Sequence, residues 1–178
     1  DVYRSVFSIF KSRSIWLVTN LFATIVAASV VGEFQDIIAQ LSILAVLMPI
    51  VASMGGTTGQ QTLAVVVRSL ATKELNSRNA LRMIGKEFMV GLCNGLLFAV
   101  MIGIAVRIWF PGQEMISYII ALAMLCNLTV ASLAGILIPL TINRLKIDPA
   151  IASGVFLIAC TDSGGYFIFL GLAKLLLF

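Results

Sequence analysis

The sequence contains no histidine, 3 cysteines and 8 acidic residues among its 178 residues, and only 11% of its residues are charged. The absence of histidine excludes the H-E-x-x-H metalloprotease motif. Cys93, Cys126 and Cys160 stand in separate apolar runs, without the close spacing of a zinc or disulfide framework. The low charge argues against a soluble domain, in which about 25% of residues are charged.

Hydrophobic residues make up 60% of the chain, and the mean hydropathy is +1.07. A helix needs about 20 mostly apolar residues to cross a bilayer. Five stretches meet this requirement, namely residues 15–32, 37–67, 88–110, 116–140 and 150–177. The sequence therefore predicts an all-α integral membrane protein with five transmembrane helices per subunit and the lipid bilayer as its solvent.

Lysine and arginine are unevenly distributed along the chain. Ten of the twelve lie in residues 4–13, 68–86 and 144–146, which alternate spans place on one side of the membrane. By the positive-inside rule this side is cytoplasmic, so we expect a cytoplasmic N-terminus and an external C-terminus in the cell membrane. The net charge of +4 is explained by this topology and does not indicate nucleic-acid binding.

The second expected span contains a polar, glycine-rich segment, residues 49–62, inside an otherwise apolar run. Pro49 cannot donate a helical hydrogen bond, and irregular backbone at membrane depth is tolerated where it lines a cavity. A kinked helix packed through small residues is the alternative. If a cavity is present, the pore-lining candidates are Gly55, Gly56, Thr57, Gly59 and Gln60.

Asp162 lies near the middle of the fifth expected span, where an aspartate costs about 2.5–3.5 kcal/mol to insert. It should therefore face water, a partner or an ion. Both Asp162 and the glycine-rich segment fall near the bilayer midplane. Carboxylate, hydroxyl and carbonyl oxygens suit hard cations such as Mg²⁺, Ca²⁺ or Mn²⁺. Because one carboxylate only half balances a divalent ion, we expect a two-fold homodimer, a pore at its interface, and outer-sphere contact with hydrated Mg²⁺.

Two blocks of the sequence form distinctive motifs. The first is PIVASMGGTTGQQ at residues 49–61, followed by VRSLA at 67–71. The second comprises DPA at 148–150, TD at 161–162 and FLGLA at 169–173. Both blocks resemble the MgtE family of magnesium channels. The resemblance covers nearly the whole chain and implies a dimeric Mg²⁺ channel in the bacterial inner membrane.

The resemblance also implies roles for particular residues. Asp162 matches the aspartate that binds the ion in the pore, which the second and fifth helices of both subunits line. Asp148 matches a cytoplasmic-side regulatory site where Mg²⁺ holds the channel shut. Residues 1–178 are then the transmembrane pore domain of a longer chain carrying cytoplasmic N-terminal and CBS regulatory domains. The family often has asparagines at the positions of Thr57 and Gln60, which leaves Mn²⁺, Co²⁺ or Ca²⁺ as alternative cargo.

Three other functions are weighed against a channel. A Na⁺-coupled Mg²⁺ exchanger would use the same Asp162 with alternating access. A non-conducting membrane assembly subunit would have no need for Asp162 and the glycine-rich segment at one depth. An intramembrane aspartyl protease needs two carboxylates in one site, whereas Asp148 lies about 21 Å from Asp162 at about 1.5 Å per helical residue. We therefore do not expect an enzyme.

Overall fold

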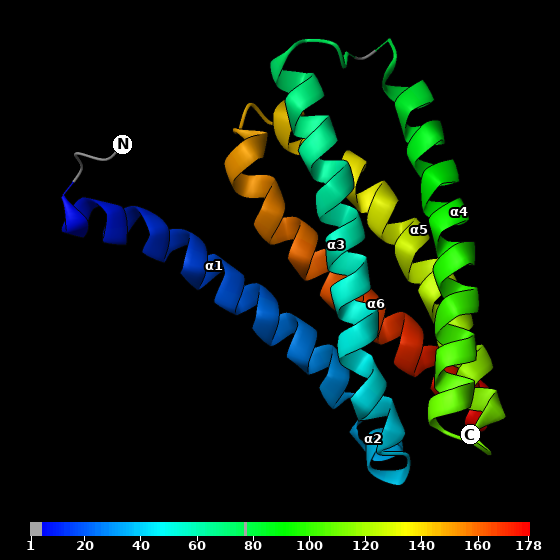
Figure 1. Ribbon diagram of the computed structural model, residues 1–178. Helices are drawn as coiled ribbons and strands as arrows, with labels where there is room; N and C mark the ends of the chain where they lie inside the picture. Colours follow the sequence, from blue (N-terminus) through cyan, green and yellow to red (C-terminus); the bar gives the residue numbers. More distant parts are fainter. Residues whose placement is uncertain (1–4, 77) are drawn as a thin grey trace.

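The computed structural model describes residues 5–76 and 78–178 of the chain. All regular structure in these residues is helical: α1 (Val6–Gly32), α2 (Gln35–Gln40), α3 (Ile43–Ala71), α4 (Ala80–Trp109), α5 (Glu114–Arg144) and α6 (Pro149–Leu177). All of them except α2 are long and apolar enough to cross a membrane by length and composition. The five expected spans are therefore confirmed as helices (Figure 1).

The start of the second expected span, residues 37–67, is wrong. Its first residues belong to the separate helix α2, and α3 begins only at Ile43. The backbone leaves the helical region at Leu41, where φ is −130° and ψ is 81°, so the chain turns there before α3 begins. Hydropathy averaged over a span does not register such a turn, although the polar residues Gln40 and Ser42 flank it.

The other helices are longer than the apolar stretches that predicted them. Helix α1 begins at Val6 rather than at residue 15, α4 begins at Ala80 rather than at residue 88, and α5 continues to Arg144. Polar residues are compatible with a helix whose ends extend beyond the hydrocarbon layer. Apolar content therefore located the spans but not the helix ends.

The connections of the helices divide between two ends of the molecule. The α3–α4 and α5–α6 connections lie at one end, whereas the turn through α2 and the α4–α5 connection lie at the other (Figure 1). The basic segments 68–86 and 144–146 thus share the first end, as expected. Of the third basic segment, residues 4–13, Arg4 lies outside the described residues.

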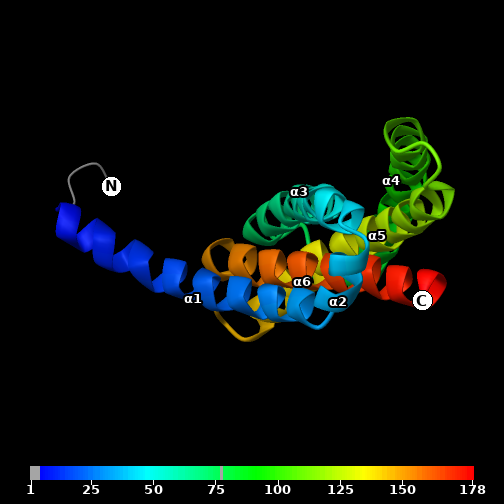
Figure 2. The ribbon, with the colours of Figure 1, turned by 90° about the horizontal axis from the view of Figure 1, so that it is seen from below.

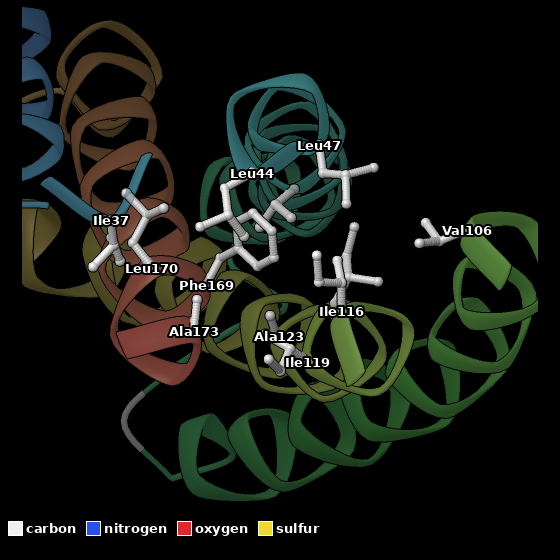
Figure 3. Close-up of a cluster of buried hydrophobic side chains, with 12 residues drawn as sticks. Ile37, Leu44, Leu47, Val106, Ile116, Ile119, Ala123, Phe169, Leu170 and Ala173 are labelled. Carbon is white, nitrogen blue, oxygen red and sulfur yellow. The ribbon is translucent and has the colours of Figure 1, made fainter. Parts of the chain in front are cut away.

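Helix α5 is the centre of the molecule and carries buried residues at intervals from Ile116 to Ile142. Helices α3, α4 and α6 all pack against it, while α1 packs against α6 (Figure 2). The largest cluster of buried side chains joins α2, α3, α4, α5 and α6 near the α2 end (Figure 3). Leu44 and Leu47 of α3, Ile119 of α5 and Phe169 of α6 are completely buried there. This packing fixes α3 and α6 on the same central helix.

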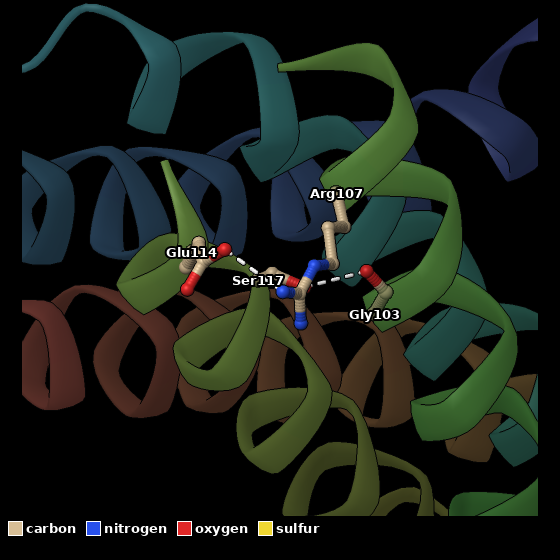
Figure 4. Close-up of polar contacts among 4 residues, drawn as sticks. All are labelled: Gly103, Arg107, Glu114 and Ser117. Atoms are coloured by element: carbon tan, nitrogen blue, oxygen red, sulfur yellow. Dashed lines mark hydrogen bonds and ion pairs between the residues drawn. The ribbon is translucent and has the colours of Figure 1, made fainter. Parts of the chain in front are cut away.

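Helix α4 approaches α5 through small residues. A Cβ atom on Gly91 would lie 2.8 Å from the Ser132 side chain, and one on Gly95 would lie 2.9 Å from the Leu125 carbonyl oxygen, so these glycines permit close contact between the two helices. Near the α4–α5 connection, the Ser117 hydroxyl donates to the Gly103 carbonyl, and Arg107 pairs with Glu114 at 2.8 Å (Figure 4). The two helices are therefore held together both at the glycine contacts and at the polar contacts near the α4–α5 connection.

Candidate functional site

Asp162 lies half-buried on α6 and faces a hollow between α1, α3 and α6. The hollow has a volume of about 270 Å³. Its other lining residues are Thr24, Ala27, Ala28 and Val31 of α1, Met48 of α3 and Tyr166 of α6. The carboxylate is therefore neither sealed in the core of the bundle nor placed on an open surface, and an ion could reach it through this hollow.

The glycine-rich segment forms continuous α-helix within α3, with Pro49 inside the helix. Gly55 and Gly59 are buried against neighbouring helices. A Cβ on Gly59 would lie 2.9 Å from the Leu157 side chain and 3.3 Å from the Ala131 carbonyl oxygen. Within one protomer these two glycines thus serve the close packing of α3 against α5 and α6, and their role in a pore stays a prediction.

The opposite face of α3 is polar and exposed. Its exposed side chains are Ser53, Thr57, Gln60 and Gln61. Thr57 donates its hydroxyl hydrogen to the Ser53 carbonyl at 2.8 Å, which leaves its oxygen lone pairs free to accept hydrogen bonds from water. We call these four residues the polar face of α3. They offer hydroxyl and amide oxygens, the hard ligands that suit divalent cations.

Gly56 connects this segment to α6. A Cβ on Gly56 would lie 4.0 Å from the Thr161 hydroxyl oxygen, and Thr161 immediately precedes Asp162. Thr161 itself is buried and donates to carbonyls of its own helix at 3.0 and 3.2 Å. The structure therefore brings the glycine-rich segment and the Asp162 region together at one level of the bundle, as the sequence predicted.

Asp148 does not join this group. It lies exposed at the start of α6, where its carboxylate accepts a hydrogen bond from the Ala150 backbone N–H at 2.9 Å and caps the helix. This capping role is a sufficient structural reason for an aspartate before Pro149. Whether Asp148 also binds a regulatory ion stays a prediction.

The sequence interpretation missed one acidic residue inside the helical bundle. Glu87 was expected to precede the third span, but the earlier start of α4 places it two turns inside that helix. It is half-buried and accepts a hydrogen bond from the Thr62 hydroxyl of α3 at 2.9 Å. Its position directly before the apolar run at residue 88 was the available signal.

The described residues contain no group of three or more histidine, cysteine, aspartate or glutamate side chains that could hold a metal ion. The described residues that line the hollow beside Asp162 include no second carboxylate. A divalent ion at this position would need water molecules, neutral oxygens or a second protein copy to complete its shell.

Comparison with known protein families shows the family to which the chain belongs. A family model described as a divalent cation transporter, MgtE, matches residues 48–172, a region that includes both the polar face of α3 and Asp162. The chain belongs to the MgtE family of divalent cation transporters. It is thus a multi-pass membrane protein of a transporter family, and not of an enzyme class.

Three bacterial MgtE proteins are similar to the chain, each named a magnesium transporter. The protein of Bacillus subtilis is 35% identical over 158 residues, covering 89% of this chain and 35% of the relative. That of Enterococcus faecalis is 36% identical and covers 93% of this chain and 36% of the relative. That of Thermus thermophilus is 29% identical and covers 96% and 37%. The chain therefore spans about a third of the length of these relatives.

Proposed function

We propose that this chain is the pore domain of a Mg²⁺ channel, formed as a two-fold dimer, with the ion path running along the polar face of α3 and past Asp162. The observation that carries the proposal is the exposure of Ser53, Thr57, Gln60 and Gln61 on a helix long enough to span the membrane. The magnesium transporters to which the chain is similar support Mg²⁺ as the cargo.

Lipid is a poor solvent for this surface. Amide and hydroxyl groups cost free energy in hydrocarbon unless they find hydrogen-bond partners, and an aspartate at the centre of a membrane helix costs about 2.5–3.5 kcal/mol. The polar face must therefore be covered by water or protein. A second copy related by a two-fold axis would cover it and add a second Asp162, which balances the charge of a divalent ion.

Mg²⁺ keeps several of its water molecules in protein sites because it dehydrates reluctantly. Asp162 would then act on the hydrated ion by accepting hydrogen bonds from its water molecules and supplying negative charge. The Thr57 hydroxyl oxygen and the Gln60 amide oxygen can accept further hydrogen bonds from the same water molecules. No side chain needs to reach the ion directly.

The direction of the chain in the membrane follows from charge. The end that carries the basic segments 68–86 and 144–146 is cytoplasmic by the positive-inside rule, which puts the C-terminus outside. Asp148 lies at this cytoplasmic end, where it is placed to respond to Mg²⁺ inside the cell together with cytoplasmic domains of a longer chain.

The test is Mg²⁺ influx into liposomes loaded with a Mg²⁺-sensitive dye, comparing the parent chain with Asp162→Asn at matched incorporation. This change removes the charge and alters the volume very little. Glu74→Gln is the matched control, because Glu74 is exposed in the α3–α4 connection and loses the same charge. We expect flux to fall to background in Asp162→Asn and to stay near the parent level in Glu74→Gln.

Equal flux in the parent and in Asp162→Asn would show that the ion path lies elsewhere. A Mg²⁺ flux that requires an opposing Na⁺ gradient would show that the protein is an exchanger and not a channel. A monomeric mass of the conducting protein, measured by light scattering in detergent, would contradict the dimeric pore.

A further inference from the structure

Asn127 is a polar side chain buried in the middle of the central helix α5, with 1% of its surface exposed. Its amide nitrogen Nδ2 donates a hydrogen bond to the Val51 carbonyl oxygen of α3 at 2.7 Å. An amide is a costly group to place in a membrane-spanning helix unless it has a partner. Its specific contact with the α3 backbone therefore calls for an explanation beyond filling space.

Two glycines lie against the Asn127 amide from two different helices. A Cβ on Gly55 of α3 would lie 2.5 Å from Nδ2, and a Cβ on Gly165 of α6 would lie 3.2 Å from Oδ1. A Cβ at Gly55 would force the Asn127 side chain to shift, because real Cβ atoms essentially never approach other heavy atoms below 3.0 Å. The Asn127 amide thus occupies the space between α3 and α6 and touches both.

These contacts lie at the level of the candidate ion path. Gly55 stands between Ser53 and Thr57 of the polar face, on the opposite side of the same helical turns. Gly165 comes three residues after Asp162, which is less than one turn of α6. We therefore expect a change in the size of the side chain at position 127 to move the polar face of α3 and Asp162 relative to one another.

We propose that Asn127 is a positioning residue that sets the separation of α3 and α6 at the level of Asp162, and thereby the discrimination between Mg²⁺ and larger divalent cations. The inference rests on the proposed function for its effect on ions, but not for its effect on helix separation. Mg²⁺ demands nearly ideal geometry around a small ion, whereas Ca²⁺ accepts a larger and more variable shell. A wider path should therefore favour Ca²⁺.

The informative substitution is Asn127→Gln, which keeps the amide and adds one methylene group. Because the Asn127 amide lies so close to both glycines that a Cβ on either one would be crowded, we expect the added length to push α3 and α6 apart by about 1 Å, somewhat less than one carbon–carbon bond. Asn127→Ala removes the amide and should let the same helices move closer. The two variants thus predict opposite shifts.

Helix separation can be measured without any ion flux. Spin labels on cysteines at Val46 of α3 and Phe167 of α6, which are both exposed, report the distance in a chain whose three native cysteines are replaced by serine. Labelled chain is diluted with unlabelled chain so that only distances within one protomer are seen. We expect a longer distance in Asn127→Gln, and a shorter one in Asn127→Ala.

Ion discrimination is then measured as the ratio of Ca²⁺ to Mg²⁺ flux into liposomes. We expect this ratio to rise severalfold in Asn127→Gln. Asn94→Gln is the matched control, since Asn94 is half-buried on α4, which packs mainly on α5. Leu128→Ala is the stability control, because Leu128 is fully buried beside Asn127 on α5 and a loss of packing there should lower both fluxes without changing their ratio.

The proposal is supported if the Ca²⁺-to-Mg²⁺ flux ratio and the α3–α6 distance both rise in Asn127→Gln and rise in none of the other variants. An unchanged distance in both Asn127 variants overturns it, whatever the ions do. A flux ratio that changes equally in Leu128→Ala also overturns it, because Asn127 would then act only through stability. If the distance shifts in both Asn127 variants but the parent chain transports no Mg²⁺, the positioning role stands and the proposed function is overturned instead.

Discussion

Gly135 on α5 lies where α3 and α5 come closest, and its replacement by alanine tests the packing of the bundle. A Cβ at this position would lie 2.7 Å from the Gly59 carbonyl oxygen and 2.8 Å from the Thr62 Cβ. Neither obstacle can rotate away, because one is backbone and the other is the branch point of a stiff side chain. Helix α3 must therefore shift as a whole.

The size of the effect follows from two opposing terms. Overpacking of a close contact costs about 1–3 kcal/mol. Because the neighbours are rigid, we expect the overpacking cost of Gly135→Ala to be about 3 kcal/mol. Alanine gains about 1 kcal/mol over glycine within a helix. The net loss is then about 2 kcal/mol, which lowers the midpoint of thermal unfolding by about 4–8 °C for a chain of this size.

The assay is thermal unfolding of the purified chain in detergent, followed by circular dichroism. Gly171→Ala on α6 is the control, because a Cβ there meets nothing within 4 Å, so this variant keeps the helix gain without the clash. We expect it to unfold at the parent temperature or slightly above. If Gly135→Ala were as stable as Gly171→Ala, the close contact of α3 and α5 would be refuted.

Five further substitutions, at four positions, separate structural roles from ion-dependent ones. Asp148→Ala should lose about 0.5–2 kcal/mol through loss of the α6 cap, whereas Asp148→Asn keeps a capping acceptor and should weaken only the inhibition of flux by Mg²⁺ on the cytoplasmic side, measured in liposomes at two concentrations. Thr62→Val should lose about 1.5–3 kcal/mol because it removes a hydrogen bond to the Glu87 carboxylate, and Glu87→Gln, which keeps an acceptor, should lose less in the same unfolding assay. Ser117→Ala should lose about 1 kcal/mol with its hydrogen bond to Gly103 and leave flux at the parent level; a fall in flux would show that the α4–α5 contact matters for the ion path.

The sequence was sufficient to predict the five long helices, but not α2, because each span is a long apolar run bounded by polar residues. It was less informative where a break falls inside an apolar region, as at Leu41, because hydropathy reports transfer into lipid and not backbone direction. The start of α4 was misplaced for a related reason. Its first two turns carry Arg82 and Lys86. The long side chains of these residues can extend toward the membrane surface.

The contacts of buried polar residues were not predictable in the same way. Asn127 could be recognised as a group that needs a hydrogen bond, but its partner, Val51, is distant in the sequence and lies on another helix. The pairing of Thr62 with Glu87 has the same character. Such contacts depend on which helix faces are packed together, and that information is not local.

The glycine-rich segment shows most clearly the limit of what can be predicted from the sequence. Successive residues of an α-helix are about 100° apart, so Gly55 and Gly59 share one face while Ser53, Thr57 and Gln60 share the opposite one. Both the glycine face and the polar face can be identified from the sequence, but either could have faced the interior of the protomer. The structure turns the glycines inward, where they permit close packing, and leaves the polar face exposed. A soluble protein could hydrate that face, but a membrane-spanning chain must cover it with water or protein, and this requirement, rather than any single ligand, is the reason for which we propose a two-fold dimer with an ion path along α3 and α6.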